Sequence, residues 1–239
     1  MSQSTTTADP APADDPGPAA RRRPGGRMRS WTVLIATISL IYLADVLPPY
    51  LTLDPAQSRA EIRPDVPLHY PLLLLHITCG TIAFLTMCLQ IWPWLRRAHP
   101  AVHRVSGTVY VFAGALPTAV LAVVLTSLEK GWAADFGTVA HASLWFTTSL
   151  VGYRMARRRR WIEHQRWMLY SVALLLGIIW GRGTVDFYTL TPFKFDVHYI
   201  FEIARWAGWM VNLIIVQIYV ELRLQPKLRR RALTGSETR

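Results

Sequence analysis

The chain has 239 residues, of which 51% are apolar, and a formal net charge of +11 at pH 7. The apolar residues fall into blocks of about twenty, the length that a helix needs to cross the hydrocarbon of a bilayer, so a soluble globular core is excluded. The positive charge is concentrated in the two tails and in two arginine-rich loops. This placement is typical of membrane topology and does not favour a nucleic-acid partner.

The apolar blocks predict six membrane-spanning helices, at about residues 31–46, 70–92, 105–125, 136–153, 167–185 and 199–222. Every backbone polar group in hydrocarbon must be hydrogen-bonded within the protein, so each block is expected to be helical. The sequence therefore predicts an all-α integral membrane protein, with a six-helix domain over residues 29–224. The second to fifth helices, within residues 68–186, are expected to form a four-helix core.

The two tails differ from the apolar domain. Residues 1–28 are rich in Pro, Ala, Asp, Ser and Thr and lack apolar periodicity, so a disordered tail is expected there. Residues 225–239 form a second, basic tail. By the positive-inside rule, both tails and both arginine-rich loops are predicted to be cytoplasmic, in a multi-pass protein of the inner (cytoplasmic) membrane.

Four histidines recur regularly in the predicted core. His76 and His141 lie inside the starts of the second and fourth blocks, and His103 and His164 lie at the starts of the third and fifth. An apolar block, an arginine-rich loop and another apolar block thus occur twice, which predicts a two-helix repeat. Because successive blocks run in opposite directions, the histidines would form two layers. We call His76 and His141 the outer pair, and His103 and His164 the inner pair.

Two facing imidazoles on neighbouring helices are what axial ligation of haem iron requires. Gly80 and Gly107 follow His76 and His103 by one turn, on the same helix face, where a porphyrin needs room. In the second repeat the corresponding residues are larger, namely Trp145 and Met168. The pattern favours haem b ligated by the histidine pairs.

Arg182 lies near the outer end of the fifth block, at about the depth of the outer pair. It is a candidate for binding a haem propionate through a charge-assisted contact. The competing partners are Asp186, one turn later on the same helix, and Asp45 near the outer end of the first block.

A zinc site is the competing metal chemistry. His99 and His103 are four residues apart, and Glu163 and His164 of the other arginine-rich loop are further candidate ligands. Pro100 lies between the first two, so a regular helix that presents both is not assured.

The chain contains the runs Leu75-His76-Ile77, Leu89-Gln90, His103-Arg104-Val105-Ser106-Gly107-Thr108-Val109-Tyr110 and His164-Gln165-Arg166-Trp167-Met168. These runs resemble the domain-of-unknown-function 2306 family of predicted bacterial membrane proteins. The resemblance covers residues 68–185, about half of the chain, and implies a multi-span inner-membrane protein without an established activity.

The layout of histidines on helices two with four and three with five is similar to that of the cytochrome b561 family. That resemblance implies two haems b and electron transfer across the membrane, with the outer pair ligating one haem and the inner pair the other. It does not identify the electron donor.

The leading functional hypothesis is a b-type haem protein that moves electrons across or within the bilayer from quinol or a small reductant. Whether it is an enzyme is left open; if it is, it is a membrane oxidoreductase. The alternative is a cofactor-free membrane transporter or accessory subunit, and the third is a zinc-dependent membrane hydrolase. The lipid bilayer is the expected partner, nucleic acid is not, and the oligomeric state is left open.

Overall fold

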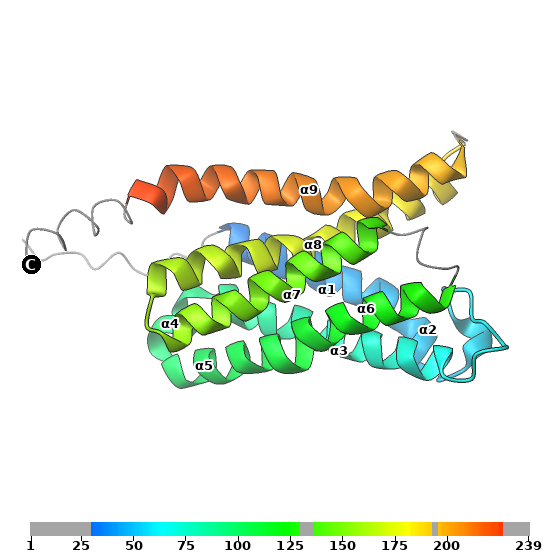
Figure 1. The fold of residues 1–239 in the computed structure, drawn as a ribbon, viewed down its shortest axis with the longest axis horizontal. Coiled ribbons are helices and arrows are strands. Elements are labelled where there is room, and N and C mark those ends of the chain that lie inside the picture. The colour runs from blue at the N-terminus through cyan, green and yellow to red at the C-terminus, as the bar shows by residue number, and fades with distance from the viewer. Residues whose placement is uncertain (1–29, 130–135, 193–195, 227–239) are drawn as a thin grey trace, which may run out of the picture.

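The computed structural model describes residues 30–129, 136–192 and 196–226, and within these ranges the ordered elements are helices, without a strand. The long helices run side by side along the length of the molecule (Figure 1). The predicted all-α class is therefore confirmed for the described part. The tail predicted at residues 1–28 and most of the basic tail lie outside it.

Five long helices are α1 (Ser30–Val46), α3 (His69–Ile91), α7 (Phe136–Arg157), α8 (Trp161–Leu190) and α9 (Val197–Arg223). A sixth long stretch is composite and consists of α5 (Pro100–Val109), the π-helical segment η2 (Tyr110–Ala115) and α6 (Leu116–Glu129). Short elements occupy the links, namely α2 (Pro48–Leu51), the 3-10 helix η1 (Pro55–Gln57) and α4 (Pro93–Ala98).

Four stretches are long and apolar enough to cross a membrane, namely His69–Ile91, Pro100–Leu128, Trp161–Leu190 and Tyr199–Arg223. The other two predicted spans are helical but do not belong to this set. α1 has 17 residues, which at about 1.5 Å per residue is shorter than the hydrocarbon core. α7 is long enough at 22 residues, but polar side chains such as His141 and Ser149 lower its apolarity. The prediction of six spans, and of a repeat built from them, is thus not confirmed.

Both arginine-rich links lie at one end of the bundle, together with the C-terminal end of α9 (Figure 1). We call this the basic end. The link between α1 and α3, with α2 and η1, lies at the opposite end. This grouping of arginines is the pattern that the positive-inside rule requires.

The core is centred on η2. Tyr110, Val111 and Ala115 are almost completely buried, and α3 supplies Ala83 and Met87, which are fully buried. A Cβ added at Gly114 would lie 2.9 Å from the Cα of Ala83, so only glycine allows η2 and α3 to approach this closely.

α9 packs along α8 and meets it most closely at small residues, among them Gly177 and Gly208. From there α9 diverges from α7 and α8 toward the basic end (Figure 1). The space between the diverging helices is bridged by Tyr170 of α8, whose hydroxyl donates to the Gln217 side chain of α9. The helix pair therefore has a tight contact at one level and a wider, side-chain-filled gap at another.

Candidate functional site

The outer histidines are each bonded to a backbone carbonyl of the next long helix. His76 Nδ1 lies 3.2 Å from the carbonyl oxygen of Thr118 in α6, and His141 Nε2 lies 2.9 Å from that of Leu174 in α8. Since a carbonyl oxygen only accepts, the ring nitrogen donates in both cases. The outer imidazoles thus link α3 to α6 and α7 to α8.

The ring of His141 is also covered by an aromatic residue. It stacks on the indole of Trp209 in α9, with ring centroids 5.7 Å apart and planes 9° apart. An imidazole that bonds through Nε2 and has one face against an indole is poorly placed for iron ligation. The geometry does not favour the outer pair as the ligands of one haem.

The two inner histidines differ from each other in their hydrogen bonding. His164 Nδ1 donates to the carbonyl oxygen of Gly152 over 2.8 Å, which leaves Nε2 as an unprotonated nitrogen. His103 Nδ1 is buried and has no hydrogen-bond partner within the described residues. His103 near the start of α5, His164 near the start of α8, and Arg96 in α4 all lie toward the basic end. The two inner histidines therefore lie at the same end of the bundle.

Gly80 and Gly107 were expected to leave space for a porphyrin, but each of them faces a side chain. A Cβ at Gly80 would lie 3.7 Å from Thr118 Cγ2, and one at Gly107 would lie 3.3 Å from the amide of Gln90. The Gln90 amide nitrogen donates to the His103 carbonyl and to Ser106 Oγ, at 2.7 Å in each case. The space beside Gly107 is therefore filled by Gln90.

Arg182 forms an ion pair with Asp186. Its Nη2 lies 3.0 Å from Asp186 Oδ1 and its Nε donates to Oδ2 over 3.2 Å. Asp45, the other candidate partner, pairs with Arg59 of the link before α3 at 2.8 Å. Of the two competing partners of Arg182, Asp186 is thus the one observed, and a role in propionate binding remains a prediction.

The candidate zinc ligands do not form a metal-binding group. His99 packs edge-on against Trp94, with centroids 5.0 Å apart, and Glu163 accepts a hydrogen bond from Arg160. Within the described ranges, no group of three or more His, Cys, Asp or Glu side chains is arranged to hold a metal ion. A zinc site needs at least three such ligands, whereas axial ligation of a haem needs two.

The centre of the bundle contains a buried hydrogen-bonded cluster that the sequence analysis did not predict. The Tyr110 hydroxyl lies 2.7 Å from Ser171 Oγ and accepts from Trp145 Nε1 over 3.3 Å, and Ser149 Oγ lies 2.7 Å from Ser171 Oγ. We call these four residues the central polar cluster. Tyr110, Ser149 and Ser171 are fully buried.

The cluster lies between the two histidines of α7 and α8. On α7, His141, Trp145, Ser149 and Gly152 follow one another at intervals of about one turn, so they share one helix face. Gly152 in turn accepts the hydrogen bond of His164. One signal for this arrangement was present in the sequence, because Ser149 and Ser171 are polar residues in the middle of apolar blocks.

This combination of apolar helices, a buried polar centre and arginines gathered at one end defines an integral membrane protein of the helical class. Residues 73–220 match the family described as "Predicted membrane protein (DUF2306)", and the chain belongs to that family. The match confirms the family expected from the histidine runs and extends beyond them into α9. No curated protein and no solved structure compared with the chain matches it.

Proposed function

We propose that the protein is a b-type haem protein of the membrane, with the inner histidines His103 and His164 as the iron ligands. The observation that carries the proposal is the buried Nδ1 of His103, which has no hydrogen-bond partner within the described residues. A buried polar atom left without a hydrogen bond costs about 1–3 kcal/mol, so it calls for an explanation such as a bound group.

The bonding of His164 also supports the proposal. A metal-bound histidine usually donates its other ring nitrogen to a carbonyl or carboxylate, which fixes the tautomer and the ring orientation. His164 has this arrangement through Nδ1 and Gly152. Haem would supply one-electron oxidation and reduction, here between a donor such as quinol in the bilayer and an acceptor at the basic end.

The remaining residues of the inner layer have supporting roles in this proposal. Arg96 supplies positive charge for an acidic group such as a propionate. Gln90 and Met168 fill the space beside Gly107 and Gly152, and both are unbranched side chains that can turn away. Because His141 is committed to Leu174 and Trp209, we propose one haem per chain at the inner pair, whereas the sequence pattern predicts two.

A cofactor-free transporter is the second candidate, and the central polar cluster favours it. Hydroxyl groups between His141 and His164 form part of a polar path along α7, and such intramembrane paths serve proton movement in transport proteins. In this case the histidines and hydroxyls pass protons and no iron is needed.

The experiment that separates the candidates is a reduced-minus-oxidised absorption spectrum of protein purified in mild detergent, from cells supplied with a haem precursor. We expect one haem per chain, lost in His103→Ala and His164→Ala and retained in the matched controls His76→Ala and His141→Ala. Loss of haem in the two control variants alone would contradict the assignment of the inner pair.

A colourless protein would overturn the haem proposal. The second candidate then predicts proton uptake into liposomes driven by a potassium diffusion potential. Tyr110→Phe should slow that uptake, whereas Tyr153→Phe, at a ring that packs edge-on against Phe112, should not.

A further inference from the structure

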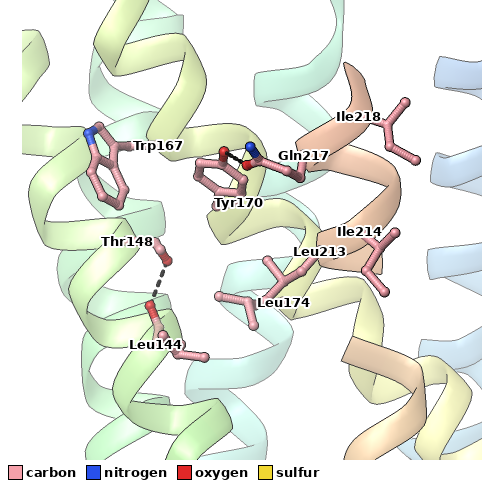
Figure 2. Close-up of a pocket in the computed structure, with 9 residues that line it drawn as sticks. All are labelled: Leu144, Thr148, Trp167, Tyr170, Leu174, Leu213, Ile214, Gln217 and Ile218. Carbon is pink, nitrogen blue, oxygen red and sulfur yellow. Dashed lines mark hydrogen bonds between the residues drawn. The ribbon is translucent and has the colours of Figure 1, made fainter. Parts of the chain in front are cut away.

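An apolar groove opens between α7, α8 and α9, in the gap where α9 diverges from α8 toward the basic end (Figure 1). It has a volume of about 410 Å³, within the usual range of small-molecule sites. Figure 2 shows the nine residues that line it, which are Leu144, Thr148, Trp167, Tyr170, Leu174, Leu213, Ile214, Gln217 and Ile218.

The groove opens sideways, where lipid chains surround the bundle. Ile214 and Ile218 of α9 are more than half exposed, and Leu144 of α7 is 40% exposed. These side chains form the rim, so an occupant can enter from the bilayer without passing through the bundle.

Three of the polar side chains on the groove walls are already paired. The Tyr170 hydroxyl donates to Gln217, and the Thr148 hydroxyl donates to the Leu144 carbonyl over 2.8 Å (Figure 2). The Gln217 amide in turn donates to Glu221 over 2.7 Å. A polar headgroup that bonded to one of these three side chains would have to break its present bond. The walls therefore suit a hydrocarbon chain better than a quinone ring.

A positive charge lies beside the aromatic residues of the groove. The guanidinium carbon of Arg166 lies 5.9 Å from the ring centroid of Trp167 and 5.8 Å from that of Tyr170. Its Nε is buried and has no hydrogen-bond partner within the described residues. A guanidinium binds phosphate through several N–H groups at once, and this one lies in α8 near its start at the basic end.

We propose that the groove is a binding site for one anionic phospholipid, with an acyl chain in the groove and the phosphate at Arg166. The apolar groove lies next to the cation, just as the acyl chain of a membrane lipid lies next to its phosphate headgroup. The tight contact of α8 with α9 and the Tyr170–Gln217 bond together hold the walls apart. This proposal is independent of haem.

The test is native mass spectrometry of the purified full-length protein, titrated with phosphatidylglycerol after removal of endogenous lipid. We expect one tightly bound molecule per chain, with about tenfold weaker binding in Arg166→Gln, because that variant loses the charge-assisted contact with the phosphate. Arg97→Gln, at an exposed arginine of α4, is the matched control and should bind as the wild type does.

A second variant tests the groove itself. Ile214→Trp places a large side chain at the exposed rim, where folding should tolerate it, and should also weaken binding. Phosphatidylcholine should bind more weakly than phosphatidylglycerol, and millimolar inorganic phosphate should not displace the lipid.

Three results would overturn the proposal. They are unchanged binding in both Arg166→Gln and Ile214→Trp, equal binding of the two lipids, and displacement of the lipid by a short-chain quinone, which would assign the groove to quinone.

Discussion

Gly208 of α9 lies directly against the backbone of Gly177 in α8. A Cβ added at Gly208 would be 2.8 Å from the Gly177 carbonyl oxygen, and one added at Gly177 would be 2.6 Å from the Cβ of Trp209. Each glycine is part of a small-xxx-small pair, Gly177 with Gly181 and Ala204 with Gly208, the spacing that lets two membrane helices touch. The close α8–α9 contact therefore requires glycine, which has no Cβ, at these two positions.

Larger residues at this contact should separate the two helices. We expect Gly177→Leu and Gly208→Leu to lower the free energy of unfolding by about 1–3 kcal/mol or more, the usual cost of overpacking. Thermal unfolding in detergent measures the change. Gly183→Leu is the matched control on α8, because nothing lies within 4 Å of a Cβ at Gly183. An equal loss in the control would show that helix propensity, and not this contact, is responsible.

The stacking of His141 on Trp209 predicts two separable effects. His141→Phe keeps a flat ring against the indole but loses the hydrogen bond to Leu174, so we expect a loss of about 1 kcal/mol. His141→Ala loses the stacking as well, which adds roughly 0.5–1.5 kcal/mol. Equal stabilities of the two variants would show that the stacking contributes nothing.

The central polar cluster should behave as a coupled unit. Tyr110→Phe leaves Ser171 and Trp145 with one partner fewer in a buried site, at an expected cost of about 1–3 kcal/mol. In a double-mutant cycle with Ser171→Ala, the two losses should not add, with a coupling of about 0.5–3 kcal/mol. Additive losses in unfolding experiments would mean that the two hydroxyl groups act independently.

The orientation in the membrane can be tested by cysteine labelling. In a chain with Cys79 and Cys88 replaced by alanine, a single cysteine at Gln57 should react with an impermeant maleimide in intact cells. One at Arg97, at the basic end, should react only after the membrane is opened. Both positions are exposed. The reverse pattern would place the basic end outside, against the positive-inside rule.

The sequence predicts the helices well because hydrophobic blocks are a strong local signal. It misjudges their ends, since α8 begins at Trp161 and ends at Leu190, whereas the predicted span is 167–185. Hydropathy marks the part of a helix that suits hydrocarbon, and the helix continues through the interface with polar residues such as Glu163 and His164. The same limitation applies to α5, which begins at Pro100 before the predicted span at 105.

The candidate site is less accessible to sequence reasoning. The histidines stand out because ionisable residues are rare in apolar blocks, but the sequence does not show which ring nitrogen is bonded or what covers the ring. Tyr110 and Ser171 are 61 positions apart, and only the packing of η2 on α8 brings them together. For Arg182, the sequence offered Asp186 and Asp45 as competing partners, and the structure shows the pair with Asp186, one turn away on the same helix.

The π-helical segment η2 has a consequence for the histidines on both sides of it. A π-helix has i→i+5 hydrogen bonds and so accommodates an extra residue relative to an α-helix. If the same residues of Tyr110–Ala115 formed regular α-helix, the half that carries His103 would be rotated by about 100° relative to the half that carries Thr118, the partner of His76. The π-helical turn thus sets the angle between an inner and an outer histidine contact, and its conversion to α-helix without loss of a residue would change both layers at once without altering either histidine.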